Sequence, residues 1–225
     1  MFFNPAKLNQ LQKKTEPIEH LPFIVKQVTH DKDMEKAISV RHNAYARHIP
    51  ELSEKLSRPE PIDTQNGVAI LLAQSKIDER PLGTVRIQTN RFGQLALEQS
   101  IQLPATLQSR SLAHISRLAI DRGIHATLVK HMLFKGLYHY WVANHIDWAI
   151  VAARRPLDRM YEKLQFLDVY PGGDYLPLAH MGNLGHRIMA FEVATAFERW
   201  HSSSHPLTQF VFHTRHPDLL LPGSD

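Results

Sequence analysis

The segment from Leu112 to Phe166 constrains the fold of this 225-residue chain more than any other part of its sequence. Its patterns predict a strand over 113–121, a turn at Arg122-Gly123, a helix of about twenty residues, an apolar strand over 148–152 and a short helix. Backbone amides at the start of the long helix can bind a phosphate or an acyl carrier group. Because Arg117 lies on the strand just before this turn, we expect a functional site here rather than scaffold alone.

The rest of the chain surrounds this unit with further strands and helices. Its polar composition predicts a flexible N-terminal arm over 1–21, and a flexible C-terminal tail is expected over 217–225. The order of the elements predicts one α/β (mixed α+β) domain over 22–216, with a central twisted mixed sheet flanked by helices. The other predicted strands are 23–28, 68–74, 82–89 and 187–192, and the other predicted helices are 32–47, 125–142, 194–201 and 206–213.

Composition excludes several classes of protein and site. The chain has no Cys, which excludes disulfides, thiolate metal sites and a cysteine nucleophile. No stretch approaches the roughly 18 apolar residues of a membrane span, and residues 1–5 lack the pattern of a secretory signal. We therefore expect a cytoplasmic location.

Charge and motifs narrow the choice further. The net charge of +4 favours acidic partners, but basic runs interleaved with aromatics are missing, so we expect no nucleic-acid partner. No HExxH occurs, and serines and Pro206 interrupt the helix that would carry His201 and His205, so no metal site is expected. The motifs of a nucleophile elbow, a dinucleotide-binding loop and a P-loop are absent as well.

Three arginines occupy positions that break local rules. Arg41 falls on the apolar stripe of the first predicted helix, and Arg86 lies on the polar face of its strand. Strand alternation places Arg117 on one face with Ile115 and Ala119. Guanidinium groups suit bidentate recognition of a carboxylate or a phosphate, so the three together indicate a binding site.

Simpler explanations exist for each arginine. Arg41 can snorkel at the edge of its stripe, and Arg86 can belong to an exposed polar face. Arg117 can form a structural ion pair with an acid such as Asp63 or Glu98. The sequence leaves both readings open.

Short motifs along the chain resemble those of the GNAT acyltransferase superfamily. The closer similarity is to the branch that holds the acyl-homoserine-lactone synthases and the long-chain N-acyl amino acid synthases. It spans roughly 23–191 and rests on the order and spacing of the motifs. These motifs are Arg41-x-x-x-Tyr45, Asp63 before a strand, Leu82-Gly83-Thr84-Val85-Arg86, Leu97-Glu98, Ile115-Ser116-Arg117-Leu118 and Tyr161-Glu162-Lys163-Leu164-Gln165-Phe166.

The resemblance implies transfer of a fatty acyl group, expected to be long, to the amine of an amino acid or a related small amine. The donor would be acyl-loaded acyl carrier protein or acyl-coenzyme A, with no permanently bound cofactor. The glycine-rich pyrophosphate loop of GNAT enzymes is reduced in this branch, and 122–126 keeps one glycine, Gly123. This favours an acyl carrier protein, whose phosphopantetheine lacks the nucleotide. Such carriers are acidic, which agrees with the basic balance of the chain.

We hypothesise roles for individual residues on this basis. His114 or Glu98 would take the amine proton, Tyr161 would protonate the leaving thiolate, and Arg117 would support the catalytic site. Backbone amides of 118–120 would receive the carbonyl oxygen. Substrate binding is expected from Arg41, Tyr45, Asp63, Arg86, Leu118, Ala119, Ile120, Arg122 and Gly123.

Two departures and three alternatives qualify this interpretation. His114 stands where relatives carry glutamate, and Gln165 where they carry glycine. An acyl-homoserine-lactone synthase is the nearest alternative, although 48–65 lacks the tryptophan usual in that loop. A coenzyme A-dependent N-acetyltransferase is another, and His114 favours a third, a non-catalytic acyl-binding module. Peripheral contact with a membrane is left open.

Overall fold

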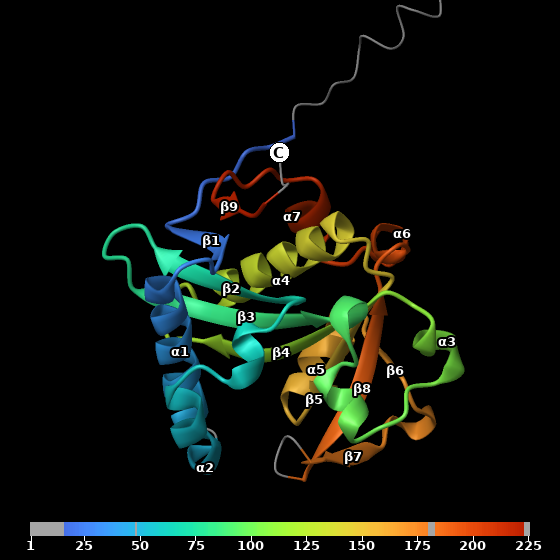
Figure 1. Ribbon diagram of the computed structural model, residues 1–225. Coiled ribbons are helices and arrows are strands. Elements are labelled where there is room, and N and C mark those ends of the chain that lie inside the picture. The colour runs from blue at the N-terminus through green and yellow to red at the C-terminus, as the bar shows by residue number, and fades with distance from the viewer. Residues whose placement is uncertain (1–15, 48, 180–182, 223–225) are drawn as a thin grey trace, which may run out of the picture.

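The computed structural model describes residues 16–47, 49–179 and 183–222. Within them, a nine-stranded mixed sheet has the order β6-β8-β5-β4-β3-β2-β1-β9, and β7 pairs with β8 (Figure 1). The strands are β1 Phe23–Gln27, β2 Val68–Ser75, β3 Pro81–Thr89, β4 Leu112–Ile120, β5 Trp148–Ala153, β6 Leu167–Asp168, β7 Tyr175–Leu178, β8 Leu184–Glu192 and β9 Leu219–Leu220.

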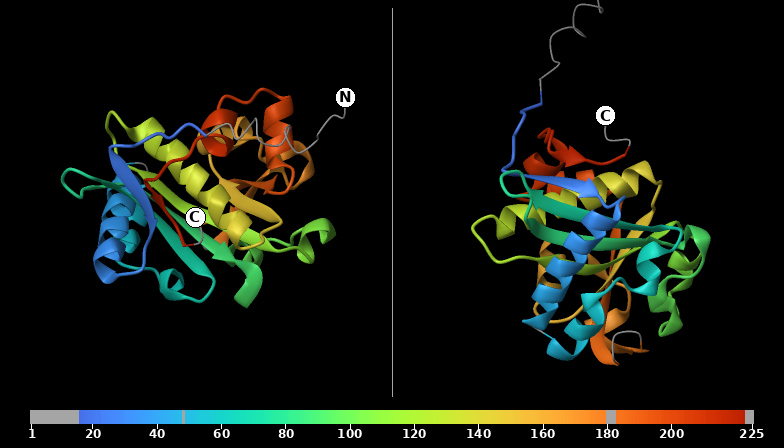
Figure 2. Two further views of the ribbon diagram at one scale, coloured as in Figure 1. Left: turned by 90° about the horizontal axis from the view of Figure 1, so that it is seen from above. Right: turned by 60° about the vertical axis from the view of Figure 1, so that its left-hand side comes forward.

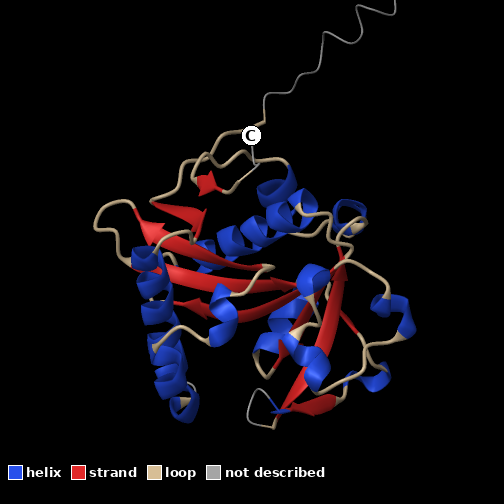
Figure 3. Ribbon diagram, in the orientation of Figure 1, coloured by secondary structure: helices blue, strands red, loops and turns tan. Residues whose placement is uncertain are grey.

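The helices lie around this sheet (Figure 3). They are α1 Asp31–Ala46, α2 Pro50–Ser53, α3 Ala105–Gln108, α4 Ala126–Ala143, α5 Leu157–Lys163, α6 Ala196–Ser202 and α7 Thr208–Phe212. Neighbours among β1 to β4 pair antiparallel. A short loop joins β2 to β3, α1 lies between β1 and β2, and the longer segment 90–111 joins β3 to β4. The α4 crossover leaves β4 and β5 parallel. The predicted fold class, a mixed sheet flanked by helices, is confirmed.

Two helices cover opposite faces of the central strands (Figure 2). Val85 and Ile87 of β3 pack into the main core with Val129 and Leu133 of α4. On the other face, Ala37 of α1 packs on β2. Because both faces are covered, β2 and β3 are buried along nearly their whole length.

The approach of α4 to β3 accounts for the glycine of the Leu82–Arg86 motif. A Cβ atom at Gly83 would lie 2.8 Å from Val129 Cγ1 and 3.1 Å from Leu133 Cδ1. A larger residue would therefore push α4 away from the sheet.

The ends of the chain differ in part from the prediction. Residues 1–15 of the predicted arm lie outside the described residues. The expected C-terminal tail is held through 217–222, because β9 pairs parallel with β1 and Leu219 and Leu221 are buried in the main core. Asp218 accepts a hydrogen bond of 2.7 Å from the backbone N–H of Leu21. The apolar run 219–221 was the signal for this edge strand.

The proline-rich loop 48–65 also contains more regular structure than expected. Pro50 begins α2, and Pro61 begins the 3₁₀ turn Pro61–Thr64. Proline suits the first position of a helix because its fixed φ fits and its missing N–H would be unpaired there. In the described ranges, no helix combines the length and apolar character needed to cross a membrane.

Candidate active site

A bulge in β4 sets the geometry of the site. Between Ser116 and Ala119, β4 holds one more residue than the facing stretch of β3. Arg117 there has a left-handed φ of 55°, which non-glycine residues seldom adopt. Ile115 packs into the core beneath α4, whereas Ser116 and Arg117 both contact groups on the α1 side. The prediction that Arg117 shares a face with Ile115 is wrong, because the bulge breaks the alternation.

The parallel pairing of β4 with β5 stops next to this bulge. The ladder runs from Leu112↔Trp148 to Ile115↔Val151, although β4 continues to Ile120. In the described ladder, 118–120 therefore has β3 on one side and no strand partner on the other. The Ile120 carbonyl accepts a hydrogen bond of 3.3 Å from Arg47 Nη2, and backbone groups of that edge that stay unpaired can bind a ligand.

The three arginines converge on the α1 side around two carboxylates of the chain. Arg41 Nη1 lies 2.8 Å from Asp63 Oδ2. Arg86 Nη1 lies 2.9 Å from Asp63 Oδ1 and 2.8 Å from Glu60 Oε2. Arg117 holds Glu60 in a bidentate pair, with Nε at 2.7 Å from Oε2 and Nη2 at 2.5 Å from Oε1. We call these five residues the arginine–carboxylate cluster.

The cluster joins four elements and is almost completely buried. Arg41 belongs to α1, Glu60 and Asp63 flank Pro61 at the 3₁₀ turn, and Arg86 and Arg117 belong to β3 and β4. Ion pairs in such a setting are strong locally but costly to desolvate. Three guanidinium groups face two carboxylates, so one positive charge is left over. Nε and Nη2 of Arg41 are buried without a hydrogen-bond partner.

The pKa values of the cluster follow from this balance. Burial alone would raise the pKa of the Glu60 carboxyl, but the hydrogen bond from Arg117 and the charges of all three arginines hold it below its usual value. Burial likewise acts to raise the pKa of Asp63, but the hydrogen bond from Arg41 and the charges of Arg41 and Arg86 hold it below its usual value. Burial acts to lower the pKa of Arg117, yet its bonds to Glu60 and Tyr45 raise it. Burial lowers the pKa of Arg86, against the charges of Glu60 and Asp63. The ion pairs thus favour the charged forms of Glu60, Asp63 and Arg117.

Two tyrosines extend the cluster toward the open edge of β4. The Arg117 guanidinium lies 5.9 Å from the centre of the Tyr45 ring. Burial, and then the charge of a neighbouring Tyr45, raise the pKa of Tyr161 above its ordinary value. Tyr161 lies on α5, which follows β5, and its ring packs edge-on against Phe166. Arg117 of β4 thus contacts Tyr45 of α1, and Tyr161 of α5 is close enough to Tyr45 for its charge to act on the Tyr161 phenol.

The two proposed bases lie in different surroundings. His114 is buried on β4 between Gln88 of β3 and Ile150 of β5, two residues before Ser116 on the same face. Glu98 lies on the 3₁₀ turn Ala96–Gln99, and its Oε2 accepts a hydrogen bond of 2.8 Å from the N–H of Leu95. In the described part of the chain, Glu98 makes no ion pair with the three arginines.

The turn before α4 lies at the exposed end of the same strand. Arg122 and Gly123 are both exposed, and the Gly123 carbonyl accepts a hydrogen bond of 3.1 Å from Ala126 N–H. Asp121 forms an ion pair of 3.0 Å with Arg80. Of the nine substrate-binding positions expected from sequence, Arg41, Asp63 and Arg86 belong to the arginine–carboxylate cluster. The other six, Arg122 and Gly123 among them, lie outside it.

Glu60 is the main residue that sequence reasoning missed. Its carboxylate is the one that all three arginines approach. The spacing Glu60-x-x-Asp63 across Pro61 was the available signal, because a turn places both side chains on one side. The carboxylates that the arginines contact belong to the chain itself, so recognition of a substrate carboxylate stays a prediction.

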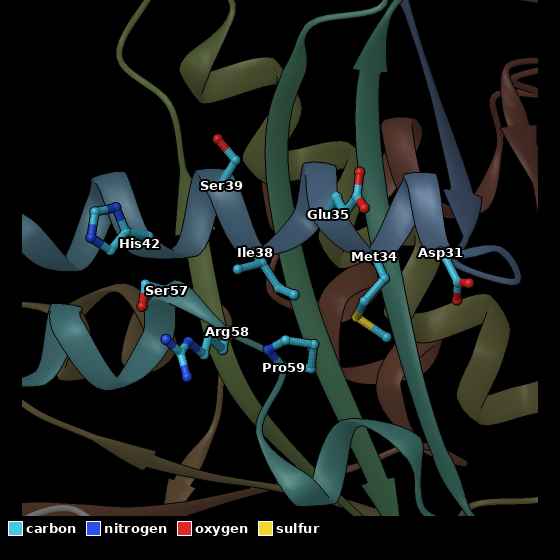
Figure 4. Close-up of a pocket in the computed structure, with 9 residues that line it drawn as sticks. All are labelled: Asp31, Met34, Glu35, Ile38, Ser39, His42, Ser57, Arg58 and Pro59. Atoms are coloured by element: carbon cyan, nitrogen blue, oxygen red, sulfur yellow. The ribbon is translucent and has the colours of Figure 1, made fainter.

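A hollow of about 540 Å³ lies between α1 and the segment that leads to Glu60. Figure 4 shows Met34 and Ile38 pointing from α1 toward Pro59 and Arg58. Acids and bases surround this apolar floor. Within the described residues, no group of three His, Asp or Glu side chains is arranged to hold a metal ion.

Comparison with solved structures identifies the fold. FeeM, an N-acyl amino acid synthase from uncultured soil microbes, has a TM-score of 0.59 at 16% identity, over 88% of this chain and 100% of that one. BjaI, a coenzyme A-dependent acyl-homoserine lactone synthase solved with S-adenosylmethionine and isopentyl-coenzyme A, has 0.55 at 11%, over 86% and 93%. A GNAT-family acetyltransferase from Desulfovibrio desulfuricans has 0.53 at 13%, over 76% and 99%.

Sequence comparison then identifies one family among the proteins that share this fold. A search of curated proteins found no match. The family model of the N-acyl amino acid synthase FeeM, however, matches residues 36–179, well over half of the chain. The matched span includes most of α1, the arginine–carboxylate cluster, the bulge and Tyr161. On that match, the chain is an acyltransferase of GNAT fold and belongs to the FeeM family of N-acyl amino acid synthases.

Proposed function

We propose that this N-acyltransferase moves a long fatty acyl group from an acyl carrier protein to the amine of an amino acid. The observation that carries the proposal is the contact of Arg117 with Tyr45 beside the stretch where β4 continues beyond its pairing with β5. The charge of Tyr45 in turn acts on Tyr161. We infer that the Tyr161 phenol, the arginine–carboxylate cluster and the amides of the open strand edge surround one reaction centre.

The reaction needs three kinds of group. The amine nitrogen attacks the thioester carbonyl carbon, so that a C–N bond forms and the C–S bond breaks. Amides on the open edge of 118–120 would receive the negative carbonyl oxygen of the intermediate. His114 or Glu98 would take the proton that the amine loses. His114 is favoured by its place on the face of Ser116 and Arg86.

Tyr161 would supply the proton that the leaving thiolate gains. Because burial raises its pKa, the phenol stays protonated at neutral pH and can donate to sulfur. The excess positive charge of the arginine–carboxylate cluster would favour an acceptor that carries a carboxylate, as an amino acid does. The turn 121–125 supports a carrier-protein donor. It holds one glycine instead of a glycine-rich pyrophosphate loop, and its Asp121 is paired with Arg80.

The direct test is product analysis. Purified protein is incubated with palmitoyl-loaded acyl carrier protein or palmitoyl-coenzyme A and mixed amino acids, and mass spectrometry is expected to find N-acyl amino acids. Absence of any acylated product with either donor would contradict the proposal. A lactone formed from S-adenosylmethionine would instead assign the activity named for BjaI.

The Tyr161 role has a matched control. Tyr161→Phe keeps the ring packed against Phe166 but removes the O–H, and we expect kcat to fall on the order of a hundredfold. Tyr138→Phe on α4, whose ring packs against Phe212, should leave kcat unchanged. Equal activity of the two variants would remove Tyr161 from the mechanism.

A further inference from the structure

A second hollow, of about 660 Å³, lies between α4 and α5. Its walls come from the first half of α4, the outer side of α5 and the connection 205–207. Apolar side chains at its base are Phe134, Met160, Leu164 and Leu207, and the basic side chains around them are Lys130, Arg159 and Lys163. We call these seven residues the basic groove.

The charge of the basic groove is unbalanced. In the part of the chain that the structure describes, the side chains of Lys130, Arg159 and Lys163 form no ion pair and no hydrogen bond, and no acid lines the hollow. His131 and His205 also line it, and burial lowers the pKa of both, so they add no charge at neutral pH. The positive charge therefore comes from the three long side chains.

Helix α5 separates its charges onto two sides. Asp158 bonds the Tyr175 hydroxyl, and Glu162 pairs with Arg187, both on the side of β7 and β8. Arg159 and Lys163, four residues apart and thus on one helix face, line the groove instead. The acids of α5 thus contact other side chains of the described structure, whereas its two basic side chains form no ion pair there.

The groove lies close to the proposed reaction centre. Its two helices, α4 and α5, directly follow β4 and β5, the strands whose pairing ends at Ile115 and Val151. Arg159 and Lys163 are each two residues from Tyr161, on a helix only about 10 Å long. A prosthetic arm anchored in the groove would start within one short helix of the thioester site.

We propose that the basic groove docks an acidic, amphipathic helix of the acyl carrier protein. This inference rests on the proposed function and adds the surface that recognises the donor. Acidic side chains of the carrier helix would pair with Lys130, Arg159 and Lys163, while its apolar side chains enter the base of the groove. The mixed character of the groove favours such a helix over a flat membrane surface, which would meet the cations but not the apolar base.

The test compares two donors that differ only in the carrier. Palmitoyl-loaded acyl carrier protein is set against S-palmitoyl-pantetheine, which lacks both protein and nucleotide. In the variant Lys130→Glu/Arg159→Glu/Lys163→Glu, the ratio of kcat/KM for the protein donor to kcat/KM for the pantetheine donor should fall at least about tenfold. A control of equal charge change, Lys32→Glu/Lys55→Glu/Arg110→Glu at exposed positions, should keep the wild-type ratio.

A salt titration of the wild type tests the proposal without any variant. KM for the protein donor should rise steeply with NaCl, whereas KM for S-palmitoyl-pantetheine should not. Fluorescence anisotropy with labelled holo-acyl carrier protein gives a readout that needs no turnover, and binding should weaken at least about tenfold in the groove variant.

The outcomes separate this inference from the proposed function. If neither donor yields product but the carrier binds and the groove variant weakens binding, the proposed function fails and the docking surface stands. If both donors react but the ratio, the salt dependence and the binding are unchanged in the groove variant, the docking surface is overturned. Loss of binding to phosphatidylglycerol vesicles with unchanged carrier binding would assign the groove to a membrane and overturn it as well.

Discussion

Two buried cationic centres lie on opposite faces of the sheet and hold their charge in different ways. On the α1 side, the arginine–carboxylate cluster pairs three guanidinium groups with Glu60 and Asp63. On the α4 side, Lys135 is 4% exposed and donates to the carbonyl of Phe210 at 3.0 Å and to that of Thr214. Its Nζ also lies 2.9 Å from His216 Nδ1. Among the described residues, no carboxylate pairs with it directly.

The difference shows what a partner does to a buried charge. Bonds to Glu60 and Tyr45 raise the pKa of Arg117 against the effect of burial, so this guanidinium keeps its charge. At Lys135 burial dominates, and its pKa falls to about 8. The first centre suits a site where a fixed positive charge is needed. The second ties α4 to α7 and the C-terminal segment, and its charge depends on pH.

Removal of a carboxylate from the cluster should have the largest effect. Asp63→Asn removes the carboxylate that lies 2.8 Å from Arg41 and leaves Glu60, at 3.5 Å, as the remaining anion near this buried guanidinium. We expect the free energy of unfolding to fall by about 3 kcal/mol. Urea unfolding followed by circular dichroism measures it. Asp78→Asn, at an exposed ion pair with Arg80, should produce no measurable change. Equal stability of the two variants would show that the cluster is not held by charge.

Loss of the bidentate pair should affect activity more than stability. Arg117→Gln removes both bonds to Glu60 and the contact with Tyr45, which moves the groups around Tyr161. We expect kcat to fall about a hundredfold, because small displacements at a reaction centre are costly. Arg110→Gln, at an exposed position outside the arginine–carboxylate cluster, is the control. A folded Arg117→Gln protein with wild-type kcat would exclude Arg117 from the site.

The two centres differ in how much of them the sequence could predict. Arg41, Arg86 and Arg117 stood out because charged residues at apolar or strand-face positions break a periodic pattern that is visible in one segment. Glu60 stood out less, because an acid in a proline-rich loop breaks no periodic pattern, and its spacing from Asp63 across Pro61 shows only that both acids lie on one side of a turn. Its importance comes from the folding of 60–63 onto β3 and β4, and such long-range contacts are not encoded in local spacing.

The same limit explains the wrong face for Arg117 and the misread C-terminus. A bulge is a mismatch between two strands, so β4 alone carries no sign that Arg117 turns toward α1. Likewise, β9 is only two residues long and exists because β1 offers it a free edge. The mixed sheet and its helices were predictable because each long element carries its own period.

The charge of Lys135 can be tested through pH. Its pKa in the folded protein, about 8, lies below the ordinary 10.5, so between these values the unfolded chain binds more protons. Wild-type stability should therefore rise with pH in this range. Relative to Lys135→Met, we expect the wild type to gain on the order of 1 kcal/mol from pH 8 to 10. The stability of Lys55→Met, a change at an exposed position, should vary with pH as that of the wild type does. A stability difference between wild type and Lys135→Met that stays constant with pH would contradict the lowered pKa.

The exposed ion pairs of Arg187 show whether burial or the number of ion pairs determines stability. Breaking one of them should have the smallest effect of these substitutions. Arg187 also contacts two carboxylates, Asp168 and Glu162, but these are 28% and 45% exposed. Water and salt screen such a pair, so Asp168→Asn should cost less than about 1 kcal/mol and nothing measurable at about 1 M NaCl. The cost of Asp63→Asn should persist at the same salt concentration, because Asp63 is fully buried. If Asp168→Asn were as costly as Asp63→Asn, the number of ion pairs rather than their burial would determine stability, and the contrast between the two buried centres would lose its physical basis.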